Sequence, residues 1–257
     1  MGFYSVFESV DRVIRGTVVG RHADDVYLAS FPKSGNTWLR FVLGNLKVLV
    51  DKLNIEVDFH TINSLIPDVQ LDRRLSMHRT STVYPRIIKT HFPYASCYSG
   101  KAIYLYRNPQ DVMVSYYYYL VDGKSKKFDS FSSFIRHERY GVYAWVRHSI
   151  SWSDLEVCSI GYESMKADPV AKIHYILDYL GLKINDELIS EAIANSSFEK
   201  MKEPEQERGD PYAKNGVYEF VRKEGSNYKD MWNKQEDLDF LYNTAGTLMR
   251  KLGYEMQ

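Results

Sequence analysis

The feature that most constrains the fold is an apolar strand that runs through a tight polar turn into a helix. Residues 26–31 (VYLASF) are mostly apolar, as in strands that are covered on both faces. Pro32-Lys33-Ser34-Gly35-Asn36 follows, and apolar residues then recur at helical spacing from Thr37 to Val50. A strand, a tight turn and a helix in this order are typical of a parallel α/β sheet.

Strands and helices continue to alternate along the chain. Further strands are predicted at 87–91, 101–107 and 157–161. Helices are predicted after Asn108-Pro109 and Asp168-Pro169, since Asn and Asp are good N-caps and proline suits the first helical position. Two more helices are predicted at 185–195 and 236–252, and a long loop at 203–219. No internal repeat or low-complexity linker interrupts the pattern. We therefore expect one domain over residues 1–257, with an α/β fold in which a parallel sheet is flanked by helices.

Composition argues against several classes of function. Lys and Arg total 33, as do Asp and Glu, and a net charge of zero is unlike a nucleic-acid-binding protein. The most apolar stretch, 38–50, is too short and too polar to span a membrane. Cys97 and Cys158 form no metal-spaced cluster and no disulfide framework, so a cytoplasmic setting is expected.

The turn after the first strand is a candidate anion site, because ligands of open α/β sheets bind beyond the carboxyl ends of the strands. Small residues from Ser34 to Thr37 let the backbone approach an oxyanion, and Lys33 adds a full charge. The turn is not a Walker A motif, because its lysine precedes the glycine. An ordinary strand–helix turn is the alternative for this segment alone.

Two more strand ends carry polar candidates. Arg107 ends the third strand, where its guanidinium could bind two phosphate oxygens; a salt bridge to Asp111 is the alternative. His91, two residues after Lys89, ends the second strand, where a histidine could act as a general base. Ser115 lies two turns into the helix after Arg107, so a shared ligand would need a cleft along that helix.

Metal chemistry is not indicated at this edge of the sheet. The predicted strands end in Phe31, His91, Arg107 and Tyr162, and none ends in Asp or Glu. Nucleotide kinases and NTPases usually hold Mg²⁺ partly through such an acid. The residues therefore predict an anion site without a metal.

Taken together, these segments resemble the cytosolic sulfotransferase family. The family's 5′-phosphosulfate loop, roughly P-K-S-G-T-T-W, is similar to Pro32–Trp38, and its K-T-H-x-P motif matches Lys89–Pro93. Its 3′-phosphate segment, R-N-P-x-D-V-x-V-S-Y-Y, matches Arg107–Tyr117. Y-E-x-M-K-x-[DN]-P matches Tyr162–Pro169, and S-F-x-x-M-K matches Ser197–Lys202. The order agrees over residues 26 to 232, which is most of the chain.

This resemblance implies a P-loop-NTPase-like sulfotransferase fold and a function. The enzyme would move the sulfonate group of 3′-phosphoadenosine 5′-phosphosulfate (PAPS) to a hydroxyl of a small-molecule acceptor, releasing adenosine 3′,5′-bisphosphate (PAP) without a metal. The implied catalytic residues are His91 as the base, with Lys33, Lys89 and Ser115. The implied residues for binding PAPS are Lys33, Ser34, Gly35, Asn36, Thr37, Trp38, Arg107, Ser115, Tyr162, Phe198, Arg222, Lys223 and Gly225.

The chain departs from the family pattern in three places. Asn36 replaces the usual threonine, and the late R-K-G-x-x-G-D-W-K motif is only partly kept at 222–229. The roles of Lys223 and Gly225 are therefore open. The family's K-x-x-x-T-V-x-x-x-E dimer signature is not visible, which leaves the oligomeric state open. Segments 51–85, 116–150 and 203–221 match no motif, so the acceptor is open too.

Two other functions are compatible with parts of this sequence. A P-loop small-molecule kinase would need the Walker spacing and a metal-binding acid, and both are missing. A non-catalytic PAP-binding protein would need no general base. The presence of His91 together with Lys33 therefore argues against this alternative.

Overall fold

A parallel four-stranded sheet forms the centre of the described part of the chain. The computed structural model describes residues 22–71, 81, 84–95, 98, 100–202 and 228–255. The strands have the order β2-β1-β3-β4, and each neighbouring pair is parallel. Their bounds are β1 Val26–Ser30, β2 Ile87–Thr90, β3 Lys101–Tyr106 and β4 Cys158–Gly161. The predicted α/β class is thus confirmed, and the four strands lie at their predicted places.

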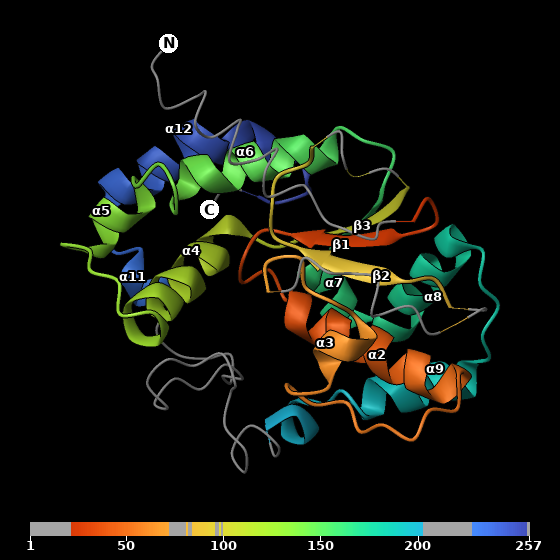
Figure 1. Ribbon diagram of the computed structural model, residues 1–257. Coiled ribbons are helices and arrows are strands. Elements are labelled where there is room, and N and C mark those ends of the chain that lie inside the picture. Colours follow the sequence, from red (N-terminus) through yellow and green to blue (C-terminus); the bar gives the residue numbers. More distant parts are fainter. Residues whose placement is uncertain are drawn as a thin grey trace.

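Helices cover both faces of this sheet (Figure 1). On one face lie α6 (Val142–Ser153) and α12 (Gln235–Lys251). On the other lie α2 (Asn36–Val50), α8 (Pro169–Leu180) and α9 (Asp186–Ala194). Both faces of β1 carry apolar side chains that must be buried. Leu28 belongs to the core beneath α2, Tyr27 packs with Trp152 of α6, and both strand residues are buried.

The helix starts follow the capping residues of the sequence. The side chain of Asn108 accepts a hydrogen bond from Gln110 N at the start of α4 (Pro109–Tyr118), as predicted. Asp168 caps α8 in the same way, and Gly181 ends that helix with a positive φ of 78°. Asn185 caps α9. The predicted loop at 203–219 lies outside the described residues.

Several helical segments were not predicted. Among them, α6 carries the buried residues Trp145 and Trp152, and the tyrosine run of α4 continues into a π-helical turn, η2 (Tyr119–Gly123). The shorter segments are α3 Ile62–Leu65, α5 Phe131–Ile135, α7 Tyr162–Ala167 and α11 Tyr228–Met231. Among the described residues, none of the helices combines the length and the apolar character needed to cross a bilayer.

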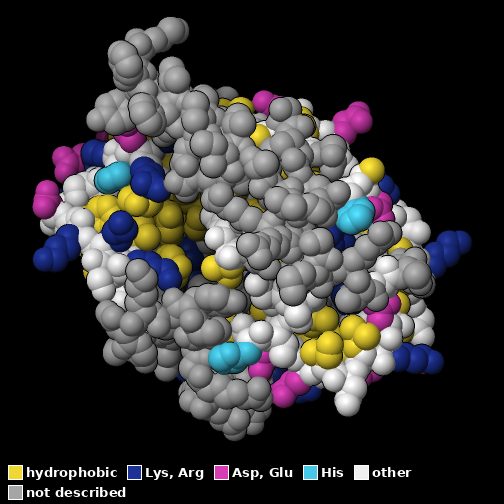
Figure 2. All heavy atoms as spheres, viewed as in Figure 1, with side chains coloured by type: hydrophobic (Ala, Val, Ile, Leu, Met, Phe, Trp, Pro, Cys, Tyr) yellow, Lys and Arg dark blue, Asp and Glu magenta, His cyan; other side chains and the backbone are white. Residues whose placement is uncertain are grey.

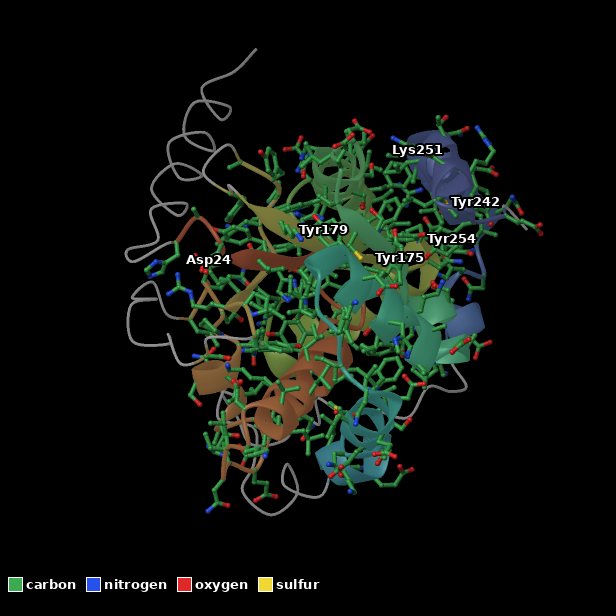
Figure 3. All side chains as sticks on the ribbon, turned by 90° about the vertical axis from the view of Figure 1, so that its right-hand side faces the viewer. Asp24, Tyr175, Tyr179, Tyr242, Lys251 and Tyr254 are labelled. Carbon is green, nitrogen blue, oxygen red and sulfur yellow. The ribbon has the colours of Figure 1, made fainter. Side chains whose placement is uncertain are left out.

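The end of the chain returns to the carboxyl edge of the sheet. Tyr254 follows α12 and lies on the same side of the molecule as Tyr175 of α8 (Figure 3). The Tyr254 hydroxyl donates to one carboxylate oxygen of Glu163 at 2.8 Å, and the backbone N–H of Asn108 donates to the other at 3.0 Å. Glu163 therefore holds the chain just after Arg107 in place.

Candidate active site

The turn after β1 has a backbone that needs glycine. Lys33 and Gly35 both have positive φ values, 68° and 91°. A Cβ atom on Gly35 would lie 2.2 Å from Cδ2 of Tyr162, so that ring packs directly on the glycine backbone. Both the conformation and the contact exclude a larger side chain at this position.

The start of α2 has the features of an anion site. No side chain caps the helix at Gly35, so the first N–H groups are not satisfied in that way. The Ser34 hydroxyl is fully buried and has no hydrogen-bond partner among the described residues. A buried hydroxyl and free helix N–H groups are donors that suit a phosphate oxygen. The turn therefore has the donors that a phosphate group needs.

Tyr162 connects three of the predicted segments. Its ring packs on Gly35, lies 4.5 Å from the guanidinium carbon of Arg107, and meets Trp38 edge-on with ring centroids 6.3 Å apart. Phe198 and Trp38 both pack against the same buried cluster around Phe41. The structure thus brings aromatic rings together beside the turn, where a flat base could stack.

Arg107 is buried at the carboxyl end of β3. Its guanidinium lies 3.3 Å from Asp111, so the salt bridge considered from the sequence is present. The Asp111 side chain is 41% exposed, which makes this a weak pair. Ser115 lies one turn after Asp111 on the same face of α4, and no hydrogen bond joins these two described residues, Ser115 and Arg107.

His91 is held in one tautomer by strand β1. Its Nδ1 lies 2.8 Å from the carbonyl oxygen of Ser30, which can only accept, so Nδ1 carries the proton. Nε2 then keeps its lone pair. Burial lowers the pKa of His91 to about 3, and the charge of Lys89 acts in the same direction. A neutral imidazole with a free Nε2 can accept a proton.

Ser30 also explains the unusual Asn36. The Asn36 side-chain amide donates to the Ser30 hydroxyl at 3.0 Å, and this hydroxyl lies 3.2 Å from Nδ1 of His91. Asn36 therefore supports the histidine through Ser30, while its backbone N–H stays at the start of α2. The sequence did not point to Ser30, because its contact depends on the pairing of β1 with β2.

Lys89 faces a partner that the sequence did not reveal. Its ammonium lies 2.5 Å from Asp68, whose side chain is 4% exposed. Burial lowers the pKa of Lys89, Arg40 lowers it further, and Asp68 opposes both. For Asp68, burial raises the pKa, but the charges of Lys89 and His91 outweigh it, so the pKa is lowered. This buried pair places Lys89, two residues before His91, opposite a carboxylate.

A second histidine lies near the first without having been predicted. His148 of α6 is 2% exposed, and its ring meets Phe31 edge-on at 5.7 Å. Burial lowers the pKa of His148 to about 3, although the backbone of Phe92 opposes this shift. The electrostatic effect of His148 is the last of the causes that lower the pKa of His91. No motif signalled it, because α6 itself was missed.

The late basic loop cannot be placed with these residues. Arg222, Lys223 and Gly225 lie outside the described part of the chain. The described candidates Lys33, His91 and Arg107 follow the carboxyl ends of three neighbouring strands. Tyr162 contacts both Gly35 and Arg107, and Ser30 contacts His91.

Comparisons with known proteins show which family the chain resembles and which solved structures share its fold. The model of the family described as "Sulfotransferase domain" matches residues 23–242. Sulfotransferase 1E1 of Bos taurus is 30% identical over 198 residues, which cover 70% of this chain and 66% of the bovine protein. The match thus spans slightly less than two thirds of that relative's length.

Solved structures share the fold. The crystal structure of mouse sulfotransferase SULT7A1 complexed with PAP has a TM-score of 0.67 and 22% identity, and the match covers 94% of this chain and 90% of that one. The structure of retinol dehydratase in a complex with retinol and PAP has a TM-score of 0.68 and 19% identity, covering 97% of this chain and 87% of that one.

Proposed function

Because this chain belongs to the sulfotransferase domain family, we propose that it is a PAPS-dependent O-sulfotransferase. It moves the sulfonate group of PAPS to a hydroxyl of a small-molecule acceptor. The observation that carries this proposal is the fixed tautomer of His91, with Nδ1 donating to the Ser30 carbonyl at 2.8 Å and Nε2 left as a base.

Donor binding is assigned to the turn after β1 and to the residues around Tyr162. The Ser34 hydroxyl and the first N–H groups of α2 would hold the 5′-phosphate. Arg107 would bind the 3′-phosphate, as a guanidinium suits a dianion. Trp38, with Phe198, offers the aromatic surface for the adenine.

Catalysis rests on proton removal and on charge. The acceptor O–H donates to Nε2 of His91, which makes the oxygen a nucleophile, while the Ser30 carbonyl stabilises the imidazolium that forms. PAPS supplies the sulfonate group when bound and leaves as PAP. Lys33, whose backbone holds φ at 68° in the turn, stabilises negative charge on the departing phosphate oxygen.

The acceptor is a small molecule that lies against aromatic side chains. Phe31 follows β1 directly, and its ring meets Tyr116 of α4 edge-on at 5.6 Å. One structural neighbour is described in a complex with retinol, an apolar alcohol, which supports an acceptor with an apolar body.

Thermal unfolding in the presence of a chelator tests the donor assignment. PAP at one hundred times its Kd should stabilise the protein by about 2.7 kcal/mol, whereas ATP should do much less. Strong stabilisation by ATP that needs Mg²⁺ would support a kinase instead. Labelled PAPS then separates an enzyme from a PAP-binding protein, because only an enzyme turns it over.

A further inference from the structure

Tyr119 presents its ring to two lysines at the edge of the candidate site. Nζ of Lys33 lies 5.1 Å from the ring centroid, and Nζ of Lys124 lies 5.3 Å from the same centroid. Aromatic faces attract cations at such distances. The lysine of the anion turn therefore shares one aromatic ring with a lysine of the segment that follows η2.

Tyr140 repeats this arrangement a short distance away. Nζ of Lys126 lies 6.0 Å from its ring centroid, and the guanidinium carbon of Arg139 lies 5.6 Å from it. Both cations are exposed, and in the described part of the chain neither forms an ion pair with a carboxylate. Asp122 and Glu138 are acids of the same region, and no ion pair joins either of them to Lys126 or Arg139.

Tyr116 joins the two tyrosines into one surface. Its ring stacks on Tyr119 with centroids 6.3 Å apart and meets Tyr140 edge-on at 6.2 Å. We call Tyr116, Tyr119 and Tyr140 the tyrosine platform. Since Tyr116 also contacts Phe31 at 5.6 Å, the platform continues directly from the turn that would hold PAPS.

Three further cations lie over rings of the platform, and we call them the basic rim: Lys124, Lys126 and Arg139. Figure 2 shows Lys and Arg side chains around an apolar surface on the side where α4 and α5 lie in Figure 1. A ligand on the platform would meet apolar faces below and positive charge at its border.

We propose that the acceptor carries an acidic group, which the basic rim binds while the aromatic body lies on the tyrosine platform. This inference rests on the proposed function. It states where the acidic group of the acceptor binds when the reacting hydroxyl of the same molecule faces His91. A carboxylate, sulfate or phosphate has the shared chemistry, an exposed oxyanion that Lys and Arg recognise. A neutral phenol would leave Lys126 and Arg139 without a carboxylate, sulfate or phosphate to bind, and an amine would be repelled.

Three phenols of one size test the proposal. They are 3-(4-hydroxyphenyl)propanoate, its primary amide, and tyramine. Their dissociation constants are measured by ligand-observed NMR or calorimetry, with the protein alone and with saturating PAP. We expect the acid to bind at least tenfold more tightly than the amide, and tyramine to bind most weakly. The difference should shrink when NaCl is raised from about 50 to 300 mM, since salt screens exposed charges.

Charge reversal identifies the residues responsible. Lys126→Glu with Arg139→Glu should bring the acid to the affinity of the amide, whereas Lys183→Glu, on the exposed turn after α8, should change neither. Equal affinities of acid and amide for the wild-type protein would overturn the proposal. A rim variant that loses PAP affinity instead would show that the rim binds the nucleotide. If the acid binds tightly but is never sulfonated, the proposed function is contradicted, while the proposal that the basic rim binds the acidic group still holds.

Discussion

Nδ1 of His91 donates its proton to the backbone carbonyl of Ser30, 2.8 Å away, and this single contact decides which ring nitrogen can act as a base. Because a carbonyl oxygen never donates, the tautomer is fixed by the strand rather than by a titrating group. His91 thus depends on the backbone of the neighbouring strand for its orientation.

The first prediction concerns the pH dependence of this histidine. Burial, followed by the charge of Lys89, lowers the pKa of His91 below the usual value of about 6.5. The base is neutral above its pKa, so the acid limb of kcat/KM should lie below pH 6.5. Long-range ¹H–¹⁵N NMR should show an Nδ1-protonated ring that does not titrate between pH 8 and 6. A ring that titrates near 6.5 would contradict this account.

The second prediction concerns Asp68. Asp68→Asn leaves Lys89 buried without its counter-charge, so the pKa of Lys89 should fall and the alkaline limb of kcat/KM should move to lower pH. Removing one partner of a buried pair should also destabilise the fold by about 3 kcal/mol.

Asp51→Asn is the matched control, because Asp51 forms a 2.7 Å pair with Lys47 at the far end of α2. It should cost stability without moving the pH profile. Adding Lys89→Arg to Asp68→Asn should restore the alkaline limb, since arginine stays charged. An unchanged limb in Asp68→Asn would mean that the ion pair serves stability alone.

The third prediction compares two glycines with positive φ. Alanine at Gly35 or Gly181 would have to adopt a positive φ, which costs about 1–2 kcal/mol. Only Gly35→Ala also drives a methyl group into the Tyr162 ring, whereas a Cβ on Gly181 meets nothing within 4 Å. Chemical denaturation should show the larger loss for Gly35→Ala, and calorimetry should show weaker PAP binding for that variant alone. Normal PAP affinity in Gly35→Ala would argue against this turn as the donor site.

The fourth prediction concerns the 3′-phosphate. Arg107→Ala should weaken PAPS binding by about 1.5–3 kcal/mol, the scale of a hydrogen bond to a charged group. Adenosine 5′-phosphosulfate lacks the 3′-phosphate, so its affinity should hardly change. Equal losses for both nucleotides, measured by competition binding, would mean that Arg107 acts through Tyr162 or Asp111 instead.

The strands and the turn after β1 were predictable from the sequence, because apolar runs, caps and glycines are local signals. The partners of the site residues were not. Ser30 and His91 are 61 positions apart, and they meet only because β1 pairs in parallel register with β2, Ala29 opposite Thr90. Asp68 lies in a segment without a motif. It meets Lys89 only because its backbone forms a parallel β-bridge beside β2 at the edge of the sheet.

The aromatic surfaces illustrate the same limit. Four consecutive tyrosines, 116–119, point all round a helix, so the sequence alone indicates only that some of their rings are buried. Which rings meet the cations depends on the π-helical turn after α4 and on Tyr140, 21 residues beyond Tyr119. Such contacts between distant segments leave no periodic pattern in the sequence.

The most direct test of the central claim is His91→Ala, with initial rates of sulfonation measured beside calorimetric binding of PAP. Loss of a positioned general base should lower kcat about 10²–10⁴-fold. The Kd of PAP should change less than about threefold, or ~0.7 kcal/mol, because the ring faces the acceptor. Lys33→Ala should damage both quantities. After circular dichroism confirms that each variant is folded, near-normal turnover in His91→Ala would contradict the account, and the predicted result is a large loss of kcat at unchanged PAP affinity.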